Sequence, residues 1–218
     1  MRDAGSDRRY SVGEEIANSA IHGAGALAAV AGLVILVAAA AATGDGWRLA
    51  SAVIFGVTLV LLYTASTLYH SIAHPRAKRV FRFIDHVAIF LLIAGTYTPF
   101  TLVSLRGPWG WSLFGVVWGL ALAGIAGQSR LLHRWTALSL VLYIAMGWAA
   151  VVAVRPLVAA VAPGGLLLLL LGGIAYTAGI GFYVWRRLPY QHAIWHGFVL
   201  AGSAFHYWAI LGYVIPAG

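Results

Sequence analysis

Long apolar runs alternate with short polar segments along nearly the whole chain. Each run has about the 20 residues that an α-helix needs to cross the hydrocarbon core of a bilayer. Seven runs qualify, at about residues 19–42, 49–70, 83–105, 109–126, 135–154, 165–185 and 192–215. The pattern therefore predicts an all-α fold, a seven-transmembrane helix bundle.

Glycine and proline separate the runs, and one proline lies inside a run. We expect Pro99 to kink the third helix, because proline lacks the N–H group and its ring clashes with the carbonyl four residues earlier. Gly115 and Gly119 have the spacing that lets two membrane helices pack closely. No linker or internal repeat is evident, so we expect a cytoplasmic tail over 1–18 and a single transmembrane domain over 19–218.

Composition supports a membrane location. The 218 residues are 61% hydrophobic and 9% charged, with a mean hydropathy of +0.87, whereas a soluble domain carries about 25% charged residues. Such a chain cannot cover a water-facing surface. We expect a multi-pass protein of the cell's inner (plasma) membrane, in contact with membrane lipids. Because cysteine is absent, a bound metal would need His, Asp, Glu or neutral oxygen ligands.

The basic residues are divided unevenly between the two sides of the predicted bundle. Only Arg48, Arg106 and Arg155 fall on one side. Because cytoplasmic loops carry the excess of Lys and Arg, the N-terminus is predicted to be cytoplasmic and the C-terminus outside. This topology explains the net charge of +8 better than nucleic-acid binding does. The other side holds the remaining basic residues: Arg2, Arg8, Arg9, Arg76, Lys78, Arg79, Arg82, Arg130, Arg134, Arg186 and Arg187.

Two histidines, His192 and His196, open the last apolar run. Residues four apart share one helix face, with Cβ atoms roughly 5–6 Å apart, so both imidazoles can bind one metal ion. This spacing alone is a weak signal, but the predicted topology adds two polar side chains at the same membrane level. His70 ends the second run and Asp85 begins the third, both on the cytoplasmic side. Three helices are thus predicted to bring three histidines and one carboxylate together.

Asp85 and Ser66 each have two open interpretations. Asp85 either serves the metal site, since acids within membranes usually have a functional partner, or has a structural place, paired with Arg82 or Arg79 or simply solvated at the membrane interface. Ser66 lies one turn deeper than His70 on the same helix face. Its hydroxyl either hydrogen-bonds a water or substrate at the metal, or bonds a carbonyl of its own helix.

The other histidines are interpreted as structural. His206 lies about 15 Å deeper than His196, at 1.5 Å per residue, and is expected to make a hydrogen bond inside the bundle. His22 is at the level of the site and is interpreted as a structural group or a partner of the ligands. His74 and His133 are expected in loops.

Three neutral imidazoles with one open position describe a catalytic zinc site. Zinc lowers the pKa of a bound water towards 7 and so provides hydroxide for hydrolysis. Asp85 would act as general base or orient the water. Because the site lies at the membrane edge, the substrate class that fits is a lipid amide or ester. The residues therefore predict a zinc-dependent lipid hydrolase.

Short motifs occur in a fixed order over nearly the whole chain. They are Glu14-Glu15-Ile16-Ala17-Asn18 before His22-Gly23, Ser66-x3-His70-Ser71, Asp85-His86 before Gly95-Thr96-Tyr97-Thr98-Pro99-Phe100, and His192-x3-His196 before Phe205-His206. In this order they make the chain resemble the hemolysin III family, the bacterial branch of the progesterone and adipoQ receptor family.

The resemblance implies seven helices, a cytoplasmic N-terminus and an intramembrane zinc on the cytoplasmic side. The family's zinc histidines match His70, His192 and His196. Its serine matches Ser66 and its aspartate matches Asp85, and both are associated with the water on the zinc. Animal members resemble the alkaline ceramidases, and a lipid amidohydrolase activity is attributed to some of them.

Two other functions are consistent with the same residues. In the first, the protein is a membrane sensor or regulator in which zinc only stabilises the helix packing. In the second, it is a cytolytic pore-forming hemolysin, which would need a polar path through the whole bilayer. The outer halves of the predicted spans are mostly Ala, Leu, Val and Gly, which is not the pattern of such a path.

Overall fold

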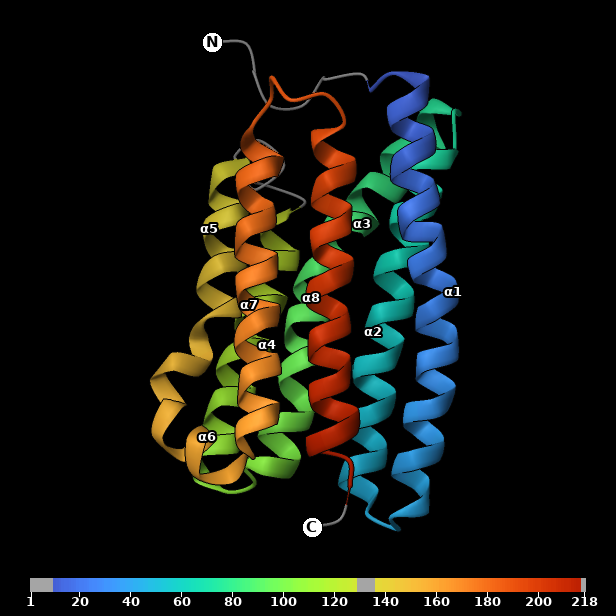
Figure 1. Ribbon diagram of the computed structural model, residues 1–218. Coiled ribbons are helices and arrows are strands. Elements are labelled where there is room, and N and C mark those ends of the chain that lie inside the picture. The colour runs from blue at the N-terminus through green and yellow to red at the C-terminus, as the bar shows by residue number, and fades with distance from the viewer. Residues whose placement is uncertain (1–9, 129–135, 217–218) are drawn as a thin grey trace.

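Long helices lie side by side along the length of the molecule (Figure 1). The computed structural model describes residues 10–128 and 136–216, and no strand occurs within these ranges. The predicted all-α class is therefore confirmed. The α-helices are α1 (Val12–Ala42), α2 (Gly46–Ser71), α3 (Pro75–Pro99), α4 (Pro108–Gly127), α5 (Thr136–Gly147), α6 (Val154–Ala160), α7 (Pro163–Val184) and α8 (Gln191–Tyr213).

Six helical segments of the described chain are long and apolar enough to cross a membrane. The 23-residue α8 runs alongside them as a further long helix. The beginning of α1 and the end of α8 lie at opposite ends of the molecule (Figure 1), as an odd number of crossings requires. The chain is thus a multi-pass membrane protein.

The first helix begins at Val12, well before the predicted span at residue 19. Ser11 forms a capping box with Glu14: the Ser11 hydroxyl accepts from the Glu14 N–H at 3.2 Å, and the Glu14 carboxylate accepts from the Ser11 N–H at 2.9 Å. These bonds satisfy N–H groups that a helix end otherwise leaves without partners. As a result, Glu14 and Glu15 belong to α1 rather than to an irregular tail.

Prolines begin three of the helices. Pro75, Pro108 and Pro163 each stand in the first turn of α3, α4 and α7, where the missing N–H removes no hydrogen bond. The third helix consequently starts at Pro75 rather than near residue 83, and Asp85 lies well inside it.

The third helix departs from α geometry directly after Pro99, where the sequence predicts a distortion. Residues Phe100–Ser104 form a π-helical turn, in which the Leu105 N–H donates to the Phe100 carbonyl five residues earlier at 2.8 Å. This irregular turn follows the proline, whereas the carbonyl that the proline ring crowds lies four residues before it, at Gly95.

The fifth predicted span is divided into three pieces. The α-helix α5 ends at Gly147, a 3₁₀ segment follows over Ala149–Ala153, and α6 completes the crossing. The side chain of Tyr97 joins this break to α3, because its hydroxyl donates to the Gly147 carbonyl and accepts from the Ala150 N–H, both at 2.9 Å.

Helix α4 packs closely against α3 at a glycine, but this glycine belongs to neither position of the predicted pair, Gly115 and Gly119. A Cβ atom added to Gly115 or Gly119 would meet no heavy atom within 4 Å, so these two glycines pack against no helix in the described chain. Gly124 instead faces the fully buried ring of Phe90. The glycine spacing was a poor guide because it does not tell which side of α4 faces the bundle.

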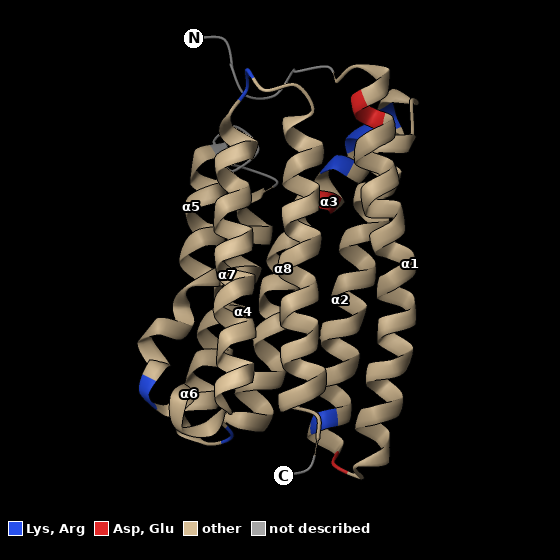
Figure 2. Ribbon diagram, viewed as in Figure 1, with Lys and Arg blue, Asp and Glu red and all other residues tan. Residues whose placement is uncertain are grey.

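Among the described residues, the charged ones lie towards the two ends of the bundle, and the middle of the ribbon carries none (Figure 2). Among the described basic residues, six lie at the end where α8 begins and only Arg48, Arg106 and Arg155 lie at the other. This distribution agrees with the loop charges from which the orientation was predicted.

Candidate metal centre

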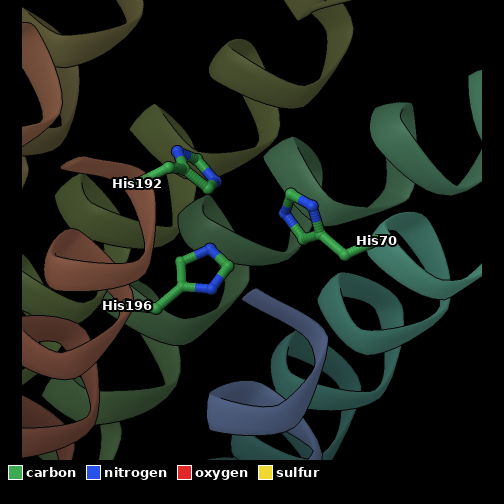
Figure 3. A group of neighbouring side chains, drawn as sticks. All are labelled: His70, His192 and His196. Carbon is green, nitrogen blue, oxygen red and sulfur yellow. The ribbon is translucent and has the colours of Figure 1, made fainter. Parts of the chain in front are cut away.

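Two helices bring three imidazoles together at one end of the bundle. His70 comes from the last turn of α2, and His192 and His196 come from the first two turns of α8 (Figure 3). One ring nitrogen of each histidine lies within 4.8 Å of the others. The ring centroids are 5.1 Å apart for both pairs that include His70 and 4.4 Å apart for His192 and His196. The group could hold a metal ion.

Several ring nitrogens of these histidines lack a hydrogen-bond partner within the described chain, as nitrogens that bind a metal ion would. Nε2 of His70 and both ring nitrogens of His192 are buried without a hydrogen-bond partner among the described residues. Buried polar atoms of this kind normally have a partner. Nitrogens about 2.0–2.1 Å from a tetrahedral zinc ion are roughly 3.4 Å apart, so small ring rotations would bring the three onto one ion. The donor set, with three imidazoles, is one that zinc accepts.

Asp85 and Ser66 lie beside this group. Asp85 is buried in α3 and lines the same cavity as His192 and His196. Its Oδ2 is 3.9 Å from Nδ1 of His86, which also contacts the Arg82 carbonyl at 2.7 Å. Ser66 is fully buried in α2. The residues that the sequence singled out are thus neighbours in space, although they come from three helices.

The structure adds a carboxylate that the sequence analysis assigned to the tail. Oε2 of Glu15 lies 2.6 Å from Nδ1 of His70. Asn18, one turn further along α1, places its backbone carbonyl oxygen 3.3 Å from Nδ1 of His196 and its side-chain nitrogen 3.4 Å from Nδ1 of His70. The sequence carried a signal for both residues: Glu15, Asn18 and His22 are spaced by three and four, and so share one face once α1 is extended by its capping box.

Among the described residues, the remaining histidines do not belong to the three-histidine group. His22 stacks on His196 and is buried, as expected for a partner of the ligands. His206 contacts the Leu169 carbonyl through Nε2 at 3.1 Å, which confirms the predicted hydrogen bond inside the bundle. His74 caps the start of α3 by accepting from the Ala77 N–H. His133 lies outside the described residues.

A cavity of about 570 Å³ starts at His192 and His196, beside His70, and runs into the bundle. His192, His196 and Asp85 line one end, and Trp148, Thr177 and His206 line deeper parts. Most of the lining is apolar, and the volume is within the range of about 300–1,000 Å³ typical of small-molecule sites. The cavity is therefore mostly apolar, with two candidate ligands and a carboxylate at one end and separate polar side chains such as Thr177 and His206 further in.

The family model described as "Haemolysin-III related" matches residues 10–207, which include every residue of this site. The chain belongs to the haemolysin III family. It is 47% identical to a hemolysin-3 homolog of Bacillus subtilis over 206 residues, covering 94% of this chain and 97% of the relative. It is 46% identical to hemolysin-3 of Bacillus cereus over 205 residues, covering 94% of each chain.

A more distant similarity extends to animals. The human monocyte to macrophage differentiation factor is 28% identical over 176 residues, covering 78% of this chain and 73% of that protein. This similarity supports the link to the progesterone and adipoQ receptor family that the motifs indicated.

Proposed function

We propose that this membrane protein of the haemolysin III family is a zinc-dependent hydrolase of lipid amides or esters. The observation that carries the proposal is the convergence of three imidazoles, two of which line the same mostly apolar cavity as the buried carboxylate of Asp85. An acyl chain would fill the apolar part, and the bond to be cleaved would then lie beside the polar end. A zinc ion bound by His70, His192 and His196 would supply a Lewis acid that activates water and polarises a carbonyl.

The protein groups around the ion have separate tasks in this proposal. The Asp85 carboxylate takes the proton of the attacking water and later returns it to the leaving group. The Ser66 hydroxyl, buried beside Asp85, hydrogen-bonds the water or the substrate oxygen. The apolar cavity walls exclude bulk water, which strengthens each of these electrostatic interactions.

We further propose that the site opens to the cytoplasmic side. The excess of Lys and Arg in the loops at the α8-start end supports this orientation. Because the chain has no cysteine, single cysteines placed at Ala77 and Gly46 would report it. In intact cells an impermeant thiol reagent should label the Gly46→Cys protein but not the Ala77→Cys protein, and the reverse pattern would contradict the orientation.

The decisive measurement is elemental analysis of detergent-purified protein. The wild type should contain about one zinc per chain, and His196→Ala should contain almost none, because two imidazoles bind the ion much more weakly than three. Hydrolysis of ceramides and lipid esters is assayed on the same samples. A wild-type protein without stoichiometric metal would contradict the proposal.

A structural role for the zinc is the second candidate. It is favoured by the fact that the three ligands join α2 to α8, so that an ion would tie the two helices together. In that case His196→Ala would lower the thermal stability, and no preparation would hydrolyse lipid. The name hemolysin of two relatives suggests cytolysis as a third candidate; dye release from liposomes that is unaffected by changes at His70 would favour it.

A further inference from the structure

The carboxylate of Glu15 bridges the ring of His70 and the ammonium group of Lys78. Oε2 lies 2.6 Å from Nδ1 of His70, and Oε1 lies 2.7 Å from Nζ of Lys78. Each carboxylate oxygen therefore has its own partner. Three helices meet in this contact, since Glu15 belongs to α1, His70 to α2 and Lys78 to α3.

Nδ1 of His70 has two neighbours, Oε2 of Glu15 at 2.6 Å and the side-chain amide nitrogen of Asn18 at 3.4 Å, and the much shorter contact decides which ring nitrogen carries the proton. A carboxylate only accepts hydrogen bonds, so Nδ1 of His70 is the protonated nitrogen and donates to Glu15. The lone pair of the neutral ring is then on Nε2, which is buried and has no partner among the described residues. Nε2 is thus the nitrogen that is left to bind a metal together with His192 and His196.

We propose that Glu15 is a positioning residue for metal binding: it holds the tautomer and the orientation of His70, and Lys78 holds Glu15. This inference rests on the metal centre proposed above. A histidine ligand whose other ring nitrogen donates to a carboxylate is a more basic ligand with a fixed ring, and loss of such a partner typically weakens metal binding about 10–100-fold.

Lys78 limits the freedom of Glu15. Its Nζ donates to Oε1 of Glu15 and also to the Tyr69 carbonyl at 3.1 Å, and it lies 5.0 Å from the centre of the Tyr69 ring. Because Tyr69 precedes His70, the ammonium group ties the carboxylate to the very turn of α2 that carries the ligand. The Glu15 side chain is 21% exposed, so this tether is what holds it against the ring.

Helix α1 also supports a second candidate ligand, His196. The Asn18 carbonyl lies 3.3 Å from Nδ1 of His196, which favours a proton on that nitrogen and leaves Nε2 of His196 for the metal. The first turns of α1 therefore orient two of the three candidate ligands, although α1 contributes no ligand itself.

The test compares Glu15→Gln with the matched control Glu14→Gln. Both remove one negative charge from the first turn of α1. Glu14 caps the helix through Oε2 and accepts from the Tyr190 N–H through Oε1 at 3.3 Å, and the side-chain oxygen of glutamine keeps the capping interaction. Zinc affinity is measured by competition with a chelator, and the visible spectrum of Co²⁺ is recorded in the same detergent-purified proteins. We expect about tenfold weaker binding and a changed spectrum for Glu15→Gln, about 100-fold weaker binding for Glu15→Ala, and wild-type values for Glu14→Gln.

Thermal unfolding of the metal-free proteins separates positioning from simple stabilisation. If Glu15→Gln lowers the unfolding temperature but binds zinc as tightly as Glu14→Gln, the inference is wrong while the metal centre stands. If the wild type binds no metal, the proposed function fails and the inference with it. Should the Glu15 variants fail to fold, Lys78→Met takes their place: severalfold weaker zinc binding supports the inference, and unchanged binding overturns it.

Discussion

The ring of His22 lies flat against the ring of His196, with centroids 3.5 Å apart and planes within 11° of each other. Both nitrogens of His22 are buried without a hydrogen-bond partner in the described chain, so the contact between these two residues is mainly ring packing. It places one aromatic wall of the cavity directly behind a candidate ligand.

This stack predicts different outcomes for two substitutions of His22. His22→Phe keeps a flat ring against His196 and should retain about one zinc per chain. His22→Ala frees the His196 ring and should weaken zinc binding by up to roughly tenfold, the lower end of the range for partners of metal ligands. Metal content and chelator competition check both. Loss of zinc from His22→Phe as complete as from His196→Ala would mean that His22 is itself a ligand.

Asp85→Asn should separate turnover from metal binding. The amide keeps the size of the carboxylate but cannot take a proton, and general acid–base groups typically contribute about 10²–10⁴-fold to rate. We therefore expect hydrolysis of ceramide or lipid ester to fall at least about 100-fold, with zinc content unchanged. Asp45→Asn, which removes a carboxylate at the start of α2, the end of that helix opposite His70, is the control. Equal turnover in Asp85→Asn and the control would remove Asp85 from the mechanism.

Gly124→Ala should destabilise the bundle, whereas Gly119→Ala should not. A Cβ atom at Gly124 would lie 2.6 Å from Cζ of Phe90, a fully buried ring without room to move. Overpacking of this kind costs about 1–3 kcal/mol. A Cβ atom at Gly119, on the same helix, meets nothing within 4 Å. The unfolding temperature in detergent checks the pair, and similar values for both variants would contradict the observed packing.

A buried hydroxyl cluster joins α2, α7 and α8. The Tyr63 hydroxyl donates to Oγ of Ser203 at 2.7 Å, and the Tyr176 hydroxyl is also 2.7 Å from that oxygen. A double-mutant cycle of Tyr63→Phe and Ser203→Ala should give a coupling of about 0.6–1.7 kcal/mol, the range of hydrogen bonds between membrane helices. Denaturant unfolding in mixed micelles measures it. Strictly additive effects would mean that this hydrogen bond contributes nothing to stability.

The sequence was a good guide to the helices and a poorer guide to their ends. Hydropathy locates spans well, because every backbone polar group in a bilayer must be satisfied within a helix. The starts at Val12 and Pro75 were missed, since they depend on caps and prolines outside the apolar runs. The same error assigned Glu15 to a tail, and so hid its contact with His70.

The sequence by itself determined the membrane class, the order of the helices and the residue types able to bind a metal. It could do so because apolar runs and the one-turn spacing of His192 and His196 are local properties of the chain. Only the tertiary structure decided that α1 lies close enough for Glu15 and Asn18 to reach His70 and His196, and that Gly124 rather than Gly119 faces α3. Those facts depend on the rotation of each helix about its axis. Packing against neighbouring helices sets this rotation. The sequence of an almost uniformly apolar helix does not reveal it.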